Sequence, residues 1–265
     1  MPFRQLVRGR VDGTTLDRVA AEVGARYGLP GATIEPLEAN NWLSTPGVIE
    51  EELFVKVITP QNALVHALLT AGRNLGVFSS GVAGFFERFD TPVEMAEHEL
   101  AATRRMFEEG VNVPEPVEAF EFEGFGVLVL EYVPDVQPLD ALARERVAVL
   151  APDLFGILAR MHAAGIVHGD LRSENVLVAD GELYVIDATK VREAAIDDAR
   201  AYDLACALAA IESLTDARTA VEAAAGTVDA AALLAAEDFL DFVNIRPDHD
   251  FDAVAVKAEI EKAVA

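Results

Sequence analysis

The sequence predicts an α+β protein in two parts, with strands concentrated in the first half of the chain and helices in the second. Apolar runs typical of strands alternate with one long helical run in the first half. From residue 139 onward the pattern is helical, except for a short hairpin near 176–186. We therefore expect three regions: an N-terminal helical extension (1–31), a first lobe (32–133) with an insert at 59–92, and a second lobe (134–265).

The first lobe begins after a helix that Thr14 or Thr15 is expected to cap and that runs to about Tyr27. The insert mixes helical and Gly/Ser-rich stretches, so we expect it to be partly ordered. A second helix is expected at about 93–109. Strands are expected at 32–38, 53–58, 117–121 and 125–130.

The second lobe is expected to be mainly helical, with an Ala-rich stretch of high helix propensity. The spacing of apolar residues and the positions of Pro and Gly predict helices at about 139–149, 153–164, 192–213, 217–225, 230–243 and 251–264.

The hairpin consists of two β-type runs joined by Asp180-Gly181, which favours a two-residue turn. If Ala179 pairs with Glu182, the other pairs follow, because each step moves one residue along both strands. The expected partners are Val178 with Leu183, Leu177 with Tyr184, Val176 with Val185, and Asn175 with Ile186.

Three oxygen-bearing side chains converge at the open end of this hairpin. Asn175 and Asp187 leave it as neighbours, and Asp170 precedes Asn175 by five residues in the entering loop. A hard cation that carries nucleotide phosphates binds oxygen ligands of this kind. The sequence therefore predicts a nucleotide–metal site there.

A lone basic residue interrupts the apolar run at 53–58. Lys56 shares one face of this strand with Phe54 and Ile58. An unpaired buried ammonium is costly, so phosphate oxygens or a glutamate would pair with it. Glu99 is the candidate glutamate, with Glu94 and Glu97 of the same helical run as alternatives. A second interpretation gives Lys56 no functional role and has it extend to solvent from an edge strand.

The segment His168-x-Asp170-Leu171-x-x-x-Asn175 resembles the protein-kinase catalytic loop, and Asp187 falls where that superfamily keeps a metal-binding Asp. The resemblance implies a bilobal kinase-like fold, with a small sheet-plus-helix N-lobe and a mainly helical C-lobe. It also implies that Asp170 orients or deprotonates the acceptor, and that Asn175 and Asp187 hold Mg²⁺, with Mn²⁺ as an alternative. Asp187-Ala188-Thr189 departs from Asp-Phe-Gly and no Ala-Pro-Glu follows, which indicates an atypical member.

Further motifs are similar to the RIO family of atypical kinases. They are Glu38-Ala39-Asn40 and the Gly110-Val111 helix end with its exit 113–116. This resemblance implies that Lys56, Glu99, Glu38 and Asn40 bind ATP phosphates or shape their loop. Pro36-Leu37 stands where the family pattern has Gly-Lys, which is a departure in the phosphate loop.

Glu131-Tyr132-Val133-Pro134 resembles the kinase hinge that connects the two lobes. By this resemblance, the backbone of Glu131 and Val133 hydrogen-bonds the adenine edge of ATP. An ordinary exit from a strand into a loop is the alternative interpretation.

The function implied by the resemblance is ATP- and Mg²⁺-dependent phosphoryl transfer by a RIO-like serine/threonine kinase. A variant of this hypothesis is an ATPase that acts as a switch in ribosome assembly. Expected partners are ATP and a protein acceptor or a ribosomal precursor particle. Two alternatives stay open: a small-molecule phosphotransferase of the aminoglycoside or choline kinase type, and a nucleotide-binding scaffold with little turnover.

The composition restricts partners and compartment. The chain has 45 acidic and 21 basic residues, a net charge of −24, and no Lys/Arg cluster, so we expect no contact with a nucleic-acid backbone. An acid-rich, Lys-poor surface resembles that of proteins from halophilic organisms, with a generally acidic cytosolic protein as the alternative. Cys206 is the single cysteine and is expected to be a small buried apolar residue. The sequence shows neither a signal peptide nor a membrane span, so a cytoplasmic location is expected.

Overall fold

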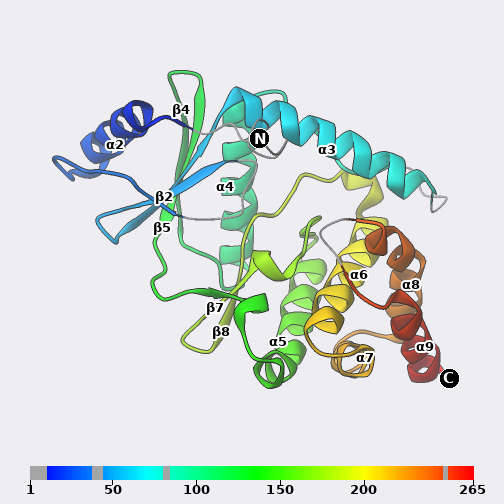
Figure 1. Ribbon diagram of the computed structural model, residues 1–265. Helices are drawn as coiled ribbons and strands as arrows, with labels where there is room; N and C mark the ends of the chain where they lie inside the picture. The colour runs from blue at the N-terminus through cyan, green and yellow to red at the C-terminus, as the bar shows by residue number, and fades with distance from the viewer. Residues whose placement is uncertain (1–10, 38–43, 80–83, 247–249) are drawn as a thin grey trace, which may run out of the picture. The chain divides into compact units, whose positions relative to one another are not determined.

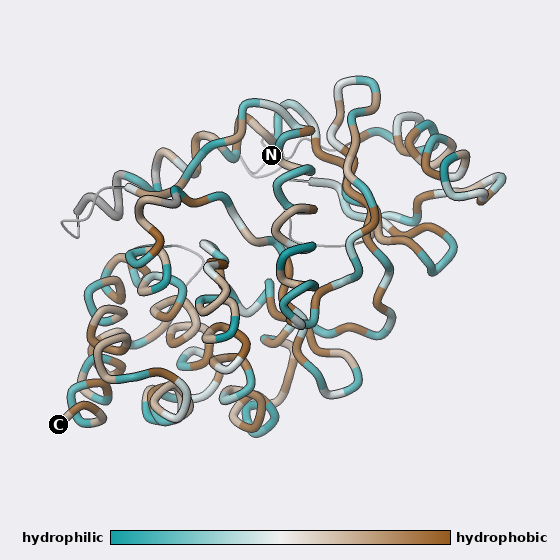
Figure 2. The backbone as a smooth tube through the Cα atoms, turned by 180° about the vertical axis from the view of Figure 1, so that it is seen from behind, coloured by the Kyte–Doolittle hydropathy of each residue, from teal (hydrophilic) through white to brown (hydrophobic). Residues whose placement is uncertain are grey.

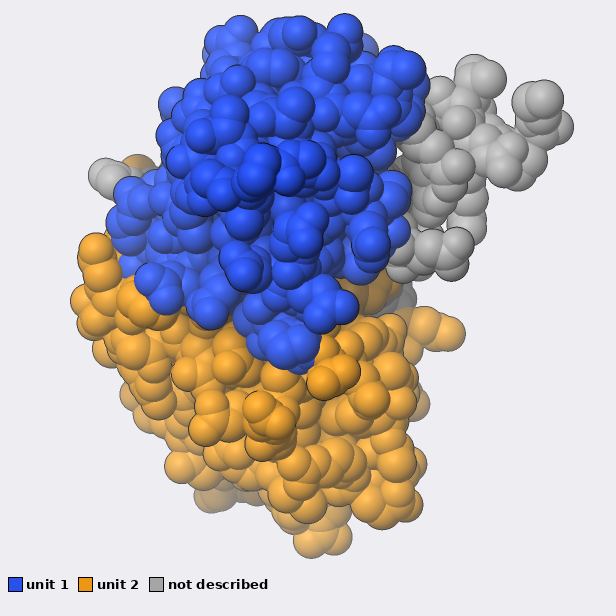
Figure 3. All heavy atoms as spheres, turned by 90° about the vertical axis from the view of Figure 1, so that its left-hand side faces the viewer, with its two compact units in different colours: residues 1–71, 88–104, 114–134 blue, residues 72–87, 105–113, 135–265 orange. Residues whose placement is uncertain are grey.

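The computed structural model describes residues 11–37, 44–79, 84–246 and 250–265. The chain divides into two compact units, coloured separately in Figure 3. Unit 1 comprises residues 1–71, 88–104 and 114–134, and unit 2 comprises residues 72–87, 105–113 and 135–265. One unit is built on a five-stranded sheet and the other is mainly helical, which confirms the α+β class.

Unit 1 is an antiparallel sheet with a helix on each face. The strand order is β1-β2-β3-β5-β4, with β1 Glu35–Pro36, β2 Thr45–Ile49, β3 Leu53–Ile58, β4 Pro116–Phe122 and β5 Phe125–Glu131. The side chains of β3 and β5 alternate between two clusters, as the period of a strand requires. One cluster includes Val19 of helix α2 (Gly13–Tyr27), and the other includes Ala96 of helix α4 (Pro92–Glu108).

One local prediction for unit 1 is wrong, and one strand was not predicted. Helix α2 is capped by Asp12, not by a threonine, since the Asp12 carboxylate accepts the Thr15 N–H at 2.9 Å. Strand β2 was not expected, because its Pro46 and Gly47 are typical of turns. Gly47 is needed there: a Cβ atom on it would lie 2.3 Å from a side-chain atom of Ile34.

The segment expected as a partly ordered insert contains a long helix, α3 (Pro60–Ser79). The division between the units falls inside it, after Ala71. Asn74 on its second half hydrogen-bonds the backbone of Phe86 in both directions, at 2.8 and 2.9 Å. Phe85 and Phe86 are buried in the core of unit 2, which explains why residues 72–87 group with that unit.

Unit 2 is a group of helices around one core, with a small three-stranded sheet of order β6-β7-β8 (Figure 1). In Figure 2 its helices alternate between apolar and polar segments, as amphipathic helices do. The elements are β6 Gln137–Pro138, η1 Leu139–Ala141, α5 Arg144–Ala163, η2 Ser173–Asn175, β7 Val176–Ala179, β8 Glu182–Val185, η3 Glu193–Ala195, α6 Ile196–Leu214, α7 Ala217–Ala225, α8 Ala230–Asn244 and α9 Ala253–Val264.

The prediction of two helices at 139–149 and 153–164 is wrong, because α5 continues through Pro152. Proline removes one backbone donor from a helix interior, which favours a break. Here Ala151, Leu154 and Phe155 are all buried, and this packing keeps the helix continuous.

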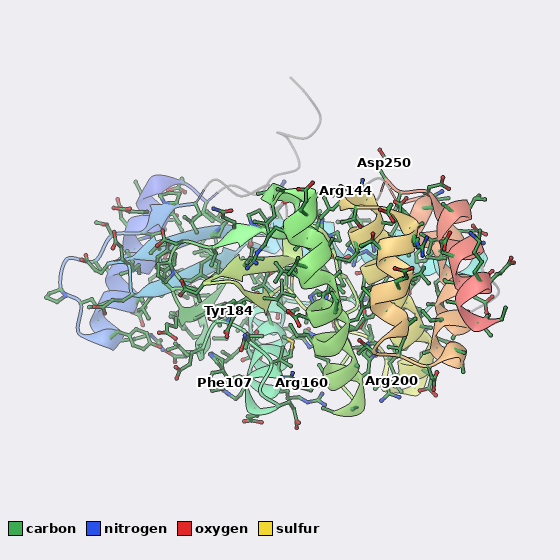
Figure 4. All side chains as sticks on the ribbon, turned by 90° about the horizontal axis from the view of Figure 1, so that it is seen from below. Phe107, Arg144, Arg160, Tyr184, Arg200 and Asp250 are labelled. Carbon is green, nitrogen blue, oxygen red and sulfur yellow. The ribbon has the colours of Figure 1, made fainter. Side chains whose placement is uncertain are left out.

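The end of α4 and the turn after it also belong to unit 2. Arg160 of α5 donates to the Gly110 carbonyl at 2.7 Å, and the Val185 N–H donates to the Asn112 carbonyl at 3.0 Å. Figure 4 labels Arg160 and, at this end of α4, Phe107. These bonds join residues 105–113 to α5 and the hairpin.

Candidate active site

The hairpin has the register predicted from its turn. Val176 pairs with Val185, Leu177 with Tyr184, Val178 with Leu183 and Ala179 with Glu182. Asp180 and Gly181 have φ values of 51° and 84°, the left-handed pair that a tight hairpin turn of this kind uses. The Ile186 N–H donates to the Asn175 carbonyl at 3.0 Å, which confirms that Asn175 lies opposite Ile186.

A buried carboxylate and a buried imidazole shape the loop before the hairpin. Asp203 of α6 accepts the N–H of His168 at 2.6 Å and that of Gly169 at 2.7 Å. The His168 ring accepts the Asp170 N–H at Nδ1, so its Nε2 carries the proton and donates to the Ile186 carbonyl, 2.8 Å away. His168 is therefore structural, and neither ring nitrogen is free to act as a base.

The structure brings the expected metal ligands to one end of the hairpin. The Asn175 amide nitrogen donates to the Asp170 carbonyl at 2.9 Å, so its amide oxygen is the atom left for a metal. Asp187 follows the second strand with φ 64°, a left-handed conformation that is uncommon outside glycine. No group of three or more His, Cys, Asp and Glu that could hold a metal occurs in the described ranges. An Asn–Asp pair fits a nucleotide-bound Mg²⁺, whose other ligands are phosphate oxygens and water.

Asp170 lies at the centre of three guanidinium groups. Its Oδ1 is 2.8 Å from Arg246 Nη2, and its Oδ2 is 2.9 Å from Arg73 Nη2 and 3.5 Å from Arg172 Nε. Burial by itself raises the pKa of Asp170, but the three arginines, led by Arg73, together lower it by more than burial raises it and hold it well below the ordinary range. Asp170 is therefore an ionised carboxylate.

The sequence analysis did not find Arg73 and Arg246. Arg73 comes from α3, and Arg246 follows α8, so each lies more than seventy positions from Asp170. Neither residue belongs to a local motif. The only sequence feature that could have pointed to Arg73 is the absence of any acidic residue from 53 to 86 in so acidic a chain.

Lys56 and Glu99 form a buried ion pair within unit 1. Lys56 Nζ lies 2.8 Å from Oε1 and 3.0 Å from Oε2 of Glu99. Lys56 is 5% exposed, on the face of β3 that α4 covers. Of the three glutamates considered, the structure places Glu99 at this lysine, whereas Glu94 accepts the Asp90 N–H at the start of α4.

The other expected site residues are placed as follows. The Glu131 N–H donates to the Glu115 carbonyl at 2.9 Å, so an adenine contact by Glu131 would have to use its carbonyl oxygen. Val133 follows the end of β5, and Glu38 and Asn40 lie outside the described residues. Cys206 is fully buried, which raises the pKa of its thiol to about 12 and confirms it as an inert core residue.

Comparison with known proteins gives one family match. The family described as RIO domain matches residues 87–202, which include Glu99, Asp170, Asn175 and Asp187. The chain is 36% identical over 93 residues to the RIO-type serine/threonine-protein kinase Rio1 of Haloferax volcanii, a match that covers 34% of this chain and 31% of that protein.

Two further relatives are named as a subunit of a complex and as a probable tRNA-modification protein. The chain is 33% identical over 98 residues to the KEOPS complex subunit Bud32 of Pyrococcus abyssi, covering 36% of this chain and 43% of that protein. It is 32% identical over 101 residues to a probable bifunctional tRNA threonylcarbamoyladenosine biosynthesis protein of Methanosarcina barkeri, covering 38% of this chain and 17% of that protein. The chain thus spans less than half the length of each of these curated relatives.

Among solved structures, the PknI kinase domain of Mycobacterium tuberculosis aligns with a TM-score of 0.45 at 13% identity, covering 89% of this chain and 96% of that domain. The family match includes the loop at 168–175 and the hairpin that follows it, whose register agrees with the one predicted from the turn. Over residues 87–202, which are less than half of the chain, the resemblance to the RIO family seen in the sequence is therefore confirmed.

Proposed function

We propose that this chain transfers the γ-phosphoryl group of ATP in a Mg²⁺-dependent reaction, as an atypical serine/threonine kinase of the RIO type. The observation that carries the proposal is the convergence of Asp170, Asn175 and Asp187 at the open end of one hairpin, next to a loop held by Asp203. Phosphoryl transfer needs little covalent chemistry from the protein, so positioned oxygen ligands and charges are its main requirement.

Each residue has a proposed role. Lys56, oriented by Glu99, neutralises phosphate charge, while the backbone of Glu131 and Val133 binds adenine. Asn175 and Asp187 hold Mg²⁺, and Mn²⁺ would suit the same oxygen ligands. Held by Asn175 and Asp187, such a metal would supply positive charge against the phosphates during transfer.

Glu38 and Asn40 are proposed to shape the phosphate loop, on the sequence resemblance alone. Asp170 orients the acceptor hydroxyl.

We also propose a cytoplasmic protein from a halophilic organism that acts on a protein or ribosomal precursor particle, with an ATPase switch as one version of this role. The names of the Rio1 and Bud32 relatives support a kinase with protein partners. The net charge of −24 favours docking through protein contacts over contacts with an RNA backbone. None of the helices in the described part of the chain has the length and apolar character that a bilayer span requires.

Assays with ³²P-labelled ATP in molar KCl test the proposal. The wild type, Asp187→Ala and Asp170→Asn are compared for Mg-ATP binding, ATP hydrolysis and autophosphorylation, with Asp153→Ala on the exposed face of α5 as the matched control. Loss of either site carboxylate should lower turnover by about 10²–10³-fold, and the control should leave it unchanged. A wild type that binds Mg-ATP but turns over no faster than the two site variants would rule out the enzyme. Adding metabolites or a ribosomal protein fraction then distinguishes a small-molecule acceptor from a protein acceptor.

A further inference from the structure

A second pocket in unit 2 is lined by none of the residues to which ATP, metal or acceptor contacts are assigned. It lies between the C-terminal half of α5, the first half of α6 and the start of α8, and its volume is about 440 Å³. Pockets that bind small molecules have volumes of about 300–1,000 Å³ and combine apolar walls with a few polar groups. The size of this pocket therefore suits a small molecule.

Small side chains leave this space open. Protein interiors are normally packed as densely as organic crystals, so a hollow between helices needs a local cause. Two leucines that are almost fully buried form one apolar wall, Leu158 of α5 and Leu204 of α6. Alanines from all three helices complete the wall: Ala159, Ala163, Ala201, Ala232 and Ala235. Because alanine fills little volume, the helices leave an apolar space between them.

One guanidinium group lines the pocket. Arg200 of α6, labelled in Figure 4, donates from Nη2 to the His162 carbonyl at 2.7 Å, which fixes its position. Its Nη1 donates to Asp197 at 3.0 Å, but the Asp197 side chain is 91% exposed. An ion pair this open to water contributes little to stability, so the carboxylate of a ligand can replace Asp197 at Arg200.

Two carboxylates complete the charged lining. One is Asp197, and the other is Asp229, which caps α8 by accepting the Ala232 N–H at 2.8 Å through Oδ1. An ionised carboxylate has about four lone-pair positions, so both acids can accept further hydrogen bonds. The pocket thus offers one positive and two negative groups beside an apolar wall.

This set of groups selects the charge of a ligand. A simple anion would face two carboxylates, and a simple cation would face the guanidinium of Arg200. A molecule that carries a carboxylate and an ammonium on one carbon, together with an apolar side chain, complements all three charges and the wall. An α-amino acid with an apolar side chain has this structure.

His162 connects the pocket with the loop at 168–175. It lines the pocket, and its Nε2 lies 3.2 Å from Oδ2 of Asp203. The same carboxylate accepts the N–H of His168 at 2.6 Å and that of Gly169 at 2.7 Å. Because Arg200 holds the carbonyl of His162, a change at Arg200 reaches the loop through a continuous chain of hydrogen bonds.

We propose that this pocket binds a free α-amino acid with an apolar side chain. The carboxylate of the ligand pairs with Arg200, its ammonium pairs with Asp197 and Asp229, and its side chain packs against the two leucines. Occupancy then changes the hydrogen bonds of the loop at 168–175 through His162 and Asp203. Binding requires neither ATP nor a metal, so the inference stands independently of the proposed phosphoryl transfer.

Isothermal titration calorimetry of the full chain at neutral pH and constant KCl provides the first test, with L-leucine and the larger L-phenylalanine as probes. We expect a Kd of about 0.1–1 mM for at least one of them. Three analogues of leucine each lack one recognised group: glycine lacks the apolar side chain, 4-methylpentanoate the ammonium and 3-methylbutylamine the carboxylate. Each should bind at least about tenfold more weakly than leucine.

Variants locate the binding to the pocket. Ala235→Leu fills the space from α8 and should abolish binding, whereas Ala231→Leu, exposed on the same helix and outside the lining, should bind as the wild type does. Arg200→Gln should weaken binding at least about tenfold, because hydrogen bonds to a charged group are the strong ones. Arg218→Gln, which removes an exposed guanidinium on α7, is its control. If Arg200→Gln does not fold, Ala235→Leu carries the test.

Amide NMR provides a second test, which reports on the loop. Saturating ligand should shift the ¹H–¹⁵N resonances of His168 and Gly169 in the wild type and leave them unchanged in Ala235→Leu. The absence of saturable heat with both amino acids up to about 10 mM, ten times the weakest expected Kd, would overturn the inference. Equal affinity for the singly charged analogues would overturn the assigned ligand class, and binding that leaves both amides unchanged would overturn the connection to the loop. A protein without ATP turnover would refute the proposed function and leave this inference untouched.

Discussion

Replacing Asp203 by asparagine tests whether one buried carboxylate holds the loop at 168–175. Asp203 is fully buried and accepts the N–H of His168 at 2.6 Å and that of Gly169 at 2.7 Å. Hydrogen bonds to a charged acceptor contribute about 1.5–3 kcal/mol each. The amide side chain in Asp203→Asn would offer only one oxygen, so one buried N–H would face an amide NH₂ group. Losing one such bond should lower the free energy of unfolding by about 3 kcal/mol. Because it displaces the loop, the substitution should also lower the proposed ATP turnover.

Urea unfolding followed by far-UV circular dichroism, at constant KCl, measures this loss. Asp197→Asn is the matched control, because it lies on the same helix with its side chain 91% exposed and its pair with Arg200 open to water. The control should stay within about 0.5 kcal/mol of the wild type. If Asp203→Asn lost no more than the control, the loop would be held by other contacts, and the assigned role of Asp203 would be refuted.

Three other predictions concern the ion pair, the sheet and the buried thiol. Lys56→Met should destabilise the protein by about 3–5 kcal/mol by breaking a buried pair, and adding Glu99→Met should restore most stability without restoring ATP turnover, as unfolding and activity assays would show. Gly126→Ala should cost about 1–3 kcal/mol in urea unfolding, because its Cβ would lie 2.1 Å from the Pro92 carbonyl oxygen and displace the start of α4. The folded pKa of Cys206 is raised to about 12, so its contribution to stability is complete below the unfolded value near 8.5 and is lost as the pH rises toward 12; unfolding between about pH 8.5 and 10 should show a decline that Cys206→Ala reduces.

Controls for the first two predictions come from matched positions. Arg18→Gln removes a pair with Glu123 whose side chains are 54% and 45% exposed, and should change stability by less than about 1 kcal/mol. Gly156→Ala lies inside α5 with open space around its Cβ position, and should be neutral or stabilising by up to about 1 kcal/mol. Equal losses at Gly126 and Gly156 would contradict the argument from close approach, and an alkaline decline that persists in Cys206→Ala would assign it to another group.

Local sequence patterns determined the hairpin and most of the strands. The Asp180-Gly181 turn sets the register, because the two residues with positive φ form a two-residue turn that pairs Ala179 with Glu182. The remaining pairs follow, because each step moves one residue along both strands. Residues 53–58 were predicted as a strand with the bounds that the structure has for β3, because a short apolar run between polar turns is typical of a buried strand. The pairing of Asn175 with Ile186, and so the convergence with Asp187, follows from the same local rules.

Tertiary structure decided everything that depends on which distant residues meet. The sequence left three glutamates as partners for Lys56, and only the packing of α4 on β3 brings Glu99 to it. Packing also carries α5 through Pro152, where local propensity predicts a break.

The hold on Asp170 is the clearest case. Arg73 and Arg246 contribute charge from a helix and a helix end far along the chain, and no spacing rule connects them. A sequence records which chemical groups are available and the periodicity of each segment. It does not record the path of the chain that turns separate charges into one electrostatic environment.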